Sequence, residues 1–165
     1  MIITAQRREW IRQHAFIPDR GAPHAVAVAI ASVIGDGNIL AAWLTWVTGT
    51  GMGTTTYTGW VVTGTDLGHV QVEYDREFYD QHAESQHHLT PTSTACWVRP
   101  LAGIIGLRWG AFYEDSSKDD TYYPARSITV TFADHEVTIG EDAVPVEQRA
   151  AADGLLAAIR KGANI

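Results

Sequence analysis

The residue types best suited to chemistry gather in one polar stretch, residues 75–88. Its imidazoles and carboxylates are the usual ligands of zinc and other divalent ions. The stretch contains Asp75, Asp80, His82, Glu84, His87 and His88. His82 and His87 are five residues apart, so they would not share one helical face, and no HExxH arrangement occurs. We interpret the stretch as a solvated loop and predict no metal or other cofactor. A metal-dependent hydrolase with His82, His87 and His88 as ligands is an alternative.

Other patterns that suggest catalysis are incomplete. Gly49, Gly51 and Gly53 imitate a phosphate-binding loop, but that chemistry needs a helix N-terminus after the glycines, and β-forming residues follow instead. No serine stands in a GxSxG context, and the acidic run 114–120 lacks the spacing of a calcium-binding loop. We therefore predict no catalytic residue and do not expect an enzyme.

Tryptophan is the most informative residue type, with 6 in the chain. Trp43 and Trp46 are an odd number of positions apart, so on one strand they point to opposite faces. One of them should lie in the core, and the other should be exposed or covered by a flanking element. Trp60, Trp97 and Trp109 stand in apolar segments and are expected in the core.

A Gly- and Thr-rich segment, residues 48–55, follows the first two tryptophans. Exposed aromatic side chains beside such a segment are typical of protein-binding surfaces, although structural packing is the simpler explanation. Trp43, Trp46 and Met52 are therefore the candidate binding residues.

The charge balance restricts the partners. Lys and Arg number 12 and Asp and Glu 19, which gives a formal net charge of −7. Nucleic acids and anionic membranes are bound through clustered basic side chains, so we predict neither as a partner. A basic protein is compatible with this charge. An acidic inhibitor or immunity-like protein is accordingly a second alternative, with an affinity that falls steeply with salt.

Cys96 is the single cysteine, so no disulfide can form within the chain. The simplest expectation is a reducing, cytoplasmic compartment of a bacterial cell. Its neighbours Ala95 and Trp97 suggest that Cys96 is a small buried apolar residue.

The elements that position these residues begin with a short helix expected at residues 5–14. A turn-rich linker follows it, so we divide the chain into an N-terminal helix with its linker, 1–23, and a domain, 24–165. Residues 24–34 fit a strand by their alternation and a helix by their Ala content and following glycine. Periodicity leaves both open, and we favour the helix. Four turn formers at 35–38 interrupt this apolar region, so we expect a soluble protein without a membrane span.

The rest of the chain predicts about seven strands and a C-terminal helix. The strands fall within residues 39–47, 57–63, 67–74, 95–98, 101–109, 127–132 and 135–139. Residues 145–161 form the helix, because Ala151, Leu155 and Ile159 recur every four positions, and Gly162 is expected to end it. These elements predict an α+β fold in which the helix packs on an antiparallel sheet.

Three segments carry a resemblance to a known family. Residues 35–42 resemble a Gly-Glu-x-hydrophobic entry into a first strand, and residues 59–67 resemble the hairpin that follows it. Residues 127–139 with the helix at 145–161 resemble the family's sheet edge and capping helix. Together they resemble the pleckstrin-homology superfold, specifically the bacterial PH-like and GRAM-like domains.

The resemblance covers about residues 24–161 and implies an antiparallel sheet or barrel of about seven strands with a C-terminal capping helix. Phosphoinositide-binding members carry a basic cluster in their first hairpin loop, whereas residues 49–54 hold no positive charge. No family ligand is therefore carried over. We expect a non-enzymatic interaction module that binds a protein or peptide, at an open sheet edge or beside the C-terminal helix. A homodimer is compatible with this expectation.

Overall fold

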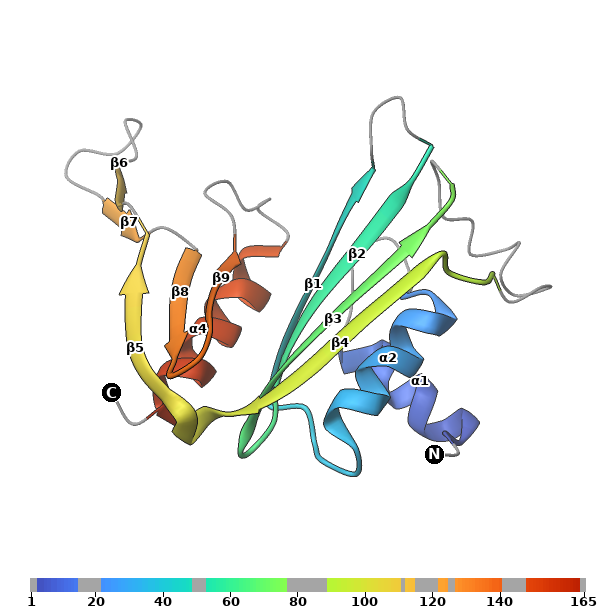
Figure 1. Cartoon of the computed structure of the whole chain (residues 1–165), viewed down its shortest axis with the longest axis horizontal. Helices are drawn as coiled ribbons and strands as arrows, with labels where there is room; N and C mark the ends of the chain where they lie inside the picture. Colours follow the sequence, from blue (N-terminus) through green and yellow to red (C-terminus); the bar gives the residue numbers. More distant parts are fainter. Residues whose placement is uncertain are drawn as a thin grey trace.

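A computed structural model describes residues 3–14, 22–48, 53–76, 89–110, 112–114, 122–124, 127–140 and 148–163. The longest strands form a four-stranded antiparallel sheet in the order β1-β2-β3-β4 (Figure 1). These strands are β1 (Ala41–Thr48), β2 (Thr55–Val62), β3 (Asp66–Tyr74) and β4 (Ser93–Pro100). Most residues of β2 are buried, because both faces of this sheet are covered.

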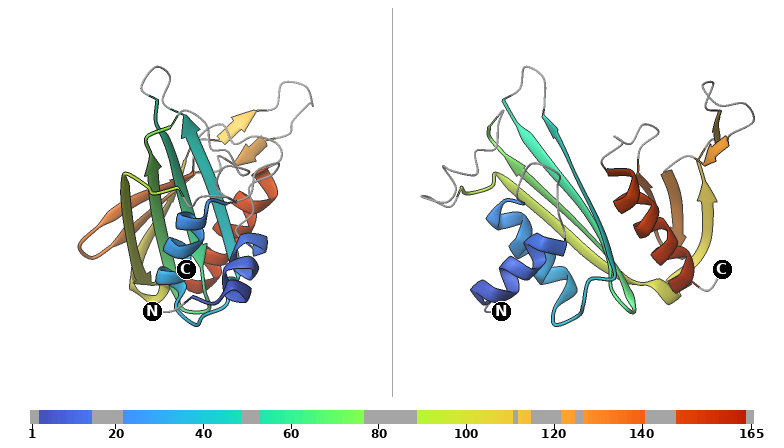
Figure 2. Two further views of the ribbon diagram at one scale, coloured as in Figure 1. Left: turned by 90° about the vertical axis from the view of Figure 1, so that its right-hand side faces the viewer. Right: turned by 180° about the vertical axis from the view of Figure 1, so that it is seen from behind.

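Two helices, α1 (Ala5–His14) and α2 (His24–Ile34), cover one face of the four-stranded sheet (Figure 2). Between them and the sheet lies the first hydrophobic cluster, which includes Ile11, Ile30, Leu44 and Tyr57. The segment whose periodicity fits both a strand and a helix is thus helical. The α2 helix packs between α1 and the sheet, which agrees with the absence of formally charged residues from its sequence.

Glycines allow α2 to end and to approach the sheet. Gly35 has φ 55°, in the left-handed region that favours glycine, and its N–H donates to Ala31 O at 3.0 Å. At Gly68 on β3, a Cβ atom would lie 2.0 Å from Val33 Cγ1 on α2. The helix can therefore pack closely on β3 only because residue 68 has no side chain.

The second half of the molecule is a three-stranded antiparallel sheet in the order β5-β8-β9. Its strands are β5 (Ile104–Trp109), β8 (Ser127–Phe132) and β9 (Glu136–Gly140). A 3-10 turn, η1 (Leu101–Gly103), joins β4 to β5, and the short strands β6 (Phe112–Glu114) and β7 (Tyr122–Pro124) pair with each other. The last helix, α4 (Arg149–Ala163), lies between the two large sheets (Figure 1).

A second hydrophobic cluster surrounds α4. It joins Leu155 and Ile159 of the helix to Trp43 and Trp60 of the first sheet and to Ile128 of the second. The four-stranded sheet therefore lies between two hydrophobic clusters, one on each of its faces.

The α+β class, the N-terminal helix at residues 5–14 and the hairpin over β8 and β9 are confirmed. Across the described residues the strands form separate open sheets, and no closed barrel is present. No helix among these residues is long and apolar enough to cross a bilayer.

Three expectations about single residues are wrong. Gly162 does not end the last helix, which continues to Ala163; a Cβ atom there would lie 2.4 Å from Leu101 Cδ1, so the glycine permits close packing on η1. Trp109 is 39% exposed, because it ends an edge strand of the second sheet. Cys96 is exposed rather than buried, because β4 is an edge strand of the first sheet.

Candidate interaction site

The feature that stands out is the outer edge of β4. β4 pairs only with β3 among the described strands, and most of its residues are exposed. The N–H of Leu101 donates to Thr65 O at 2.8 Å, and the antiparallel register of β3 and β4 continues from this hydrogen-bonded pair. Hydrogen-bonded pairs alternate along an antiparallel ladder, so Ala95 and Trp97 direct their backbone groups toward β3. Thr94, Cys96 and Val98 accordingly direct theirs outward, away from the sheet, and they define the free edge.

Pro100 agrees with this assignment. It falls in the same alternating set as the free edge and has no N–H to donate, which sheets tolerate only where the group would face away from the ladder. The free edge therefore offers three backbone N–H donors, those of Thr94, Cys96 and Val98, and Pro100 adds no fourth.

The other sheet edges carry protection that β4 lacks. β5 has a register shift between Ile104 and Gly106, a β-bulge of the kind that blocks pairing with another strand. β9 is short and carries Glu136, whose carboxylate lies 3.5 Å from the Arg108 guanidinium. On β1 only Val47 is exposed, and α4 packs against this strand. From Ser93 to Val98, β4 has no charge, no proline and no bulge.

A groove of about 420 Å³ runs between the free edge and α2. It is lined by Ala25, Ala29 and Ser32 of α2 and by Thr94 and Cys96 of β4, together with His24, Val28 and residues 89–91. Partial burial in this groove raises the pKa of the Cys96 thiol, while a hydrogen bond with Ser32 acts in the opposite direction. The thiol is therefore protonated at neutral pH and acts as a small neutral wall residue.

The other face of β4 carries an aromatic row. Trp43, Trp60, His69 and Trp97 are aligned across the four strands by their register. The His69 ring lies 4.3 Å from the Trp60 ring and 5.5 Å from the Trp97 ring, centroid to centroid. Burial lowers the pKa of His69, whose Nδ1 atom has no hydrogen-bond partner within the described part of the chain. The row keeps an uncharged imidazole between two indoles.

The row also connects β4 to the second sheet. The Trp97 ring packs edge-to-face against the ring of His135, which lies in the turn between β8 and β9, with the ring centroids 6.1 Å apart. Arg99 donates to both carboxylate oxygens of Asp134, at 2.6 and 3.2 Å, and the pKa of Asp134 is lowered mainly by that hydrogen bond. One end of β4 is thus fixed to the β8–β9 turn, which holds the free edge in place.

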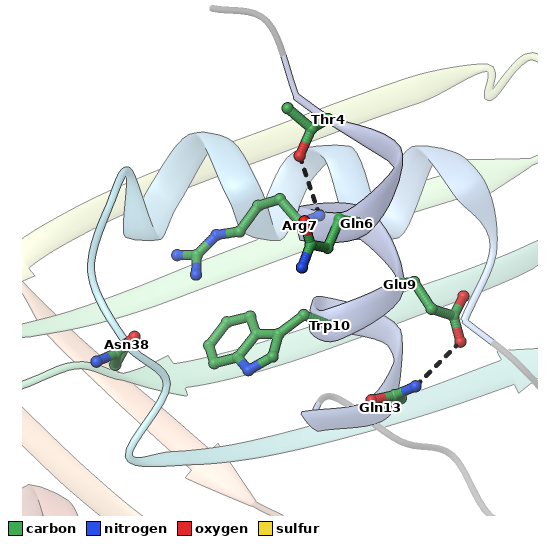
Figure 3. A pocket seen from close by; sticks show the side chains of 7 residues that line it. All are labelled: Thr4, Gln6, Arg7, Glu9, Trp10, Gln13 and Asn38. Atoms are coloured by element: carbon green, nitrogen blue, oxygen red, sulfur yellow. Dashed lines mark hydrogen bonds between the residues drawn. The ribbon is translucent and has the colours of Figure 1, made fainter.

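A second hollow, of about 570 Å³, lies on α1, and its lining comes almost wholly from that helix (Figure 3). Arg7 lies 4.3 Å from the centre of the Trp10 ring. Its guanidinium donates to the carbonyls of Gly35 and Gly37, just beyond the C-terminus of α2, where a positive charge is favourable. Arg7 and Trp10 therefore have a structural role in joining α1 to α2, and we assign no ligand to this hollow.

The candidate binding residues from the sequence do not form one site. Trp43 is in the second cluster, and Trp46 is half-buried on the opposite face of the sheet beside the first cluster. Met52 lies outside the described residues, as do His82, His87 and His88. Within the described ranges no group of three or more His, Cys, Asp or Glu side chains is placed to hold a metal ion.

The sequence does not reveal the free edge, because no alternating pattern of apolar and polar residues marks this strand. The segment from Ser93 to Val98 combines exposed and small residues without the alternation of a half-buried strand. Pro100 at its end is the one positive mark of an edge strand in the sequence.

No family model matches this chain, and searches of curated proteins and of solved structures gave no match.

Proposed function

We propose that this protein is a non-enzymatic interaction module that binds a protein or peptide partner by strand addition at β4. The observation that carries the proposal is the free edge of Thr94, Cys96 and Val98 on β4, a mostly exposed strand that pairs only with β3 among the described strands. Strand addition takes its affinity from backbone hydrogen bonds and needs no catalytic or charged motif. This mode fits a sequence in which no such motif is complete.

The groove beside the edge supplies the means of selection. A strand paired with β4 directs every second side chain toward α2 and the others toward the face of Trp97. The groove walls at Ala25, Ala29 and Ser32 are small and uncharged, so they fit apolar or β-branched side chains of the incoming segment. The partner's segment is therefore extended, free of charge on its groove side and free of proline where it must donate.

The fold supports the pleckstrin-homology resemblance at the level of architecture. A four-stranded and a three-stranded antiparallel sheet followed by a C-terminal helix agree with the element order on which that resemblance rests. We propose a PH-like domain that acts through its sheet edge, with no phosphoinositide ligand.

The test compares two lysine variants of exposed valines on edge strands of the same sheet. Val98, on β4, is 50% exposed, and Val47, on β1, is 59% exposed. In a native pull-down we expect partners to be retained by the wild type and by Val47→Lys and lost by Val98→Lys, because a lysine on a free edge opposes pairing. Hydrogen exchange of the complex should then show new protection at the amides of Thr94, Cys96 and Val98. A partner that still binds Val98→Lys would contradict the proposal.

A further inference from the structure

We infer that the segment that pairs with β4 is the β4 strand of a second copy of this chain, so that the protein forms a symmetric dimer with a continuous eight-stranded sheet. This inference rests on the proposed function, since it names the partner of the same edge. The occupant follows from three properties of the edge: its charge, its donor spacing and the side chains that would meet.

Charge favours a second copy. The chain carries a formal charge of −7, so two copies repel each other over most of their surface. Neither α2 nor β4 contains Asp, Glu or Lys, and Arg99, the one formally charged residue of β4, is paired with Asp134. The face formed by α2 and β4 is therefore one on which two copies meet without opposing like charges.

The donor spacing is symmetric about Cys96. The outward N–H groups belong to Thr94, Cys96 and Val98, and Pro100 cannot extend the set. In an antiparallel pair with a two-fold axis at Cys96, Thr94 of one copy faces Val98 of the other, and the two Cys96 residues face each other. All three donors on each copy are then used, giving about six new hydrogen bonds. A register shifted by two residues, with Thr94 of one copy opposite Pro100 of the other, leaves the Thr94 carbonyl of each copy without a donor, because proline has no N–H.

The side chains that meet in this register are complementary. On the groove side, Val98 of one copy lies beside Thr94 of the other, a pair of β-branched residues suited to neighbouring strands. On the opposite face, the indole of Trp97 lies beside the small, exposed Ala95. No two bulky side chains and no like charges are directly opposed, and the two α2 helices flank the new strand pair on the same side.

Self-association tests this inference directly. Analytical ultracentrifugation over a range of protein concentrations should show a reversible dimer. Val98→Lys should raise its dissociation constant about tenfold or more, because symmetry introduces the change twice. Val47→Lys should leave the constant unchanged, and circular dichroism should show that both variants are folded. Because the face is uncharged while each copy carries a charge of −7, raising the salt concentration should not weaken the dimer.

A thiol-specific cross-link tests the register. In a hydrogen-bonded antiparallel pair the two Cys96 Cα atoms would be about 5.5 Å apart, so a short bismaleimide should join two wild-type chains. It should fail to join two chains of a Cys96→Ser, Val47→Cys double variant, which carries its thiol on β1. Exchange of the amides of Thr94, Cys96 and Val98 should slow as the protein concentration rises, whereas exchange at Ala95 and Trp97 should be slow throughout.

The outcomes separate this inference from the proposed function. A monomer at every concentration that still captures a partner through β4 overturns the inference and leaves the proposed function standing. A monomer that captures nothing overturns both, whereas a dimer unaffected by Val98→Lys overturns the inference alone. A dimer that Val98→Lys dissociates, without any other protein captured, supports the inference and restricts the module's partner to itself.

Discussion

At the level of single residues, the missing side chain at Gly68 sets the distance between α2 and β3. A methyl group there would lie 2.0 Å from Val33 Cγ1, and the stiff, branched valine cannot turn away at low cost. We expect Gly68→Ala to lower the free energy of unfolding by about 1–3 kcal/mol, as overpacking does. Urea denaturation monitored by circular dichroism measures it.

Gly64→Ala is the matched control for this substitution. A Cβ atom at Gly64 meets nothing within 4 Å, so the change should be close to neutral. Equal stability of the two variants would show that α2 can move outward without loss, and the close contact would then have no energetic weight.

The ring of His69 gives the fold a pH dependence. Burial lowers the pKa of this imidazole below its ordinary value of 6.5, so the folded state holds it neutral at a pH where the unfolded chain binds a proton. The stabilising contribution is therefore complete above pH 6.5 and is lost as the pH falls below 6.5 toward the folded pKa. We expect a smaller loss of stability between pH 7.5 and 5.5 in His69→Phe, which keeps a ring between the indoles, than in the wild type.

Urea midpoints at the two pH values measure this difference. Identical pH dependence in the wild type and in His69→Phe would contradict the prediction. It would mean that the faces of Trp60 and Trp97 stabilise the imidazolium enough to cancel its loss of hydration.

At the level of elements, the sequence predicts what is local. The helix at residues 5–14 and the hairpin at 127–139 have a clear period or turn, and the structure confirms them. The period of residues 24–34 does not separate a strand from a helix, because an apolar segment buried on several sides has no distinguishing period; the Ala content and following glycine favour the helix, which the structure confirms. Contact with α1 and the sheet makes this segment a helix.

The candidate site was beyond prediction because an edge is defined by strand order. Cys96 and Trp109 lie in apolar segments that are typical of a core, yet each is on an edge strand of its sheet. Only the pairing of distant segments determines which strand has no neighbour. The sequence favours an open sheet edge as one recognition mode, but nothing in it assigns that edge to β4.

At the level of the whole molecule, one hydrogen bond attaches α4 to the first sheet at the start of the helix. The indole N–H of Trp43 donates to Gln148 Oε1 at 3.2 Å, and both residues are buried. Gln148→Leu leaves a buried donor without an acceptor, so we expect the free energy of unfolding to fall by about 1–3 kcal/mol.

Gln148→Glu keeps an acceptor oxygen at the same place but buries a carboxyl group, so we expect it to be less stable than the wild type at neutral pH. Denaturation followed by tryptophan fluorescence should rank the wild type above Gln148→Leu. An unchanged midpoint for Gln148→Leu would show that the contact between α4 and the sheet rests on the apolar packing of Leu155 and Ile159 alone.

The position of the four-stranded sheet between two hydrophobic clusters also determines which of its residues can be substituted over evolutionary time. β2 faces a core on both sides, so substitutions along it carry the cost of a cavity or an overpacked contact in one cluster or the other. The exposed positions of β4 contribute little to either cluster, and the hydrogen bonds of strand pairing come from their backbone. Selection can therefore alter the side chains at Thr94, Ala95 and Val98 with little loss of stability, which makes the recognition strand the most adaptable part of the sheet.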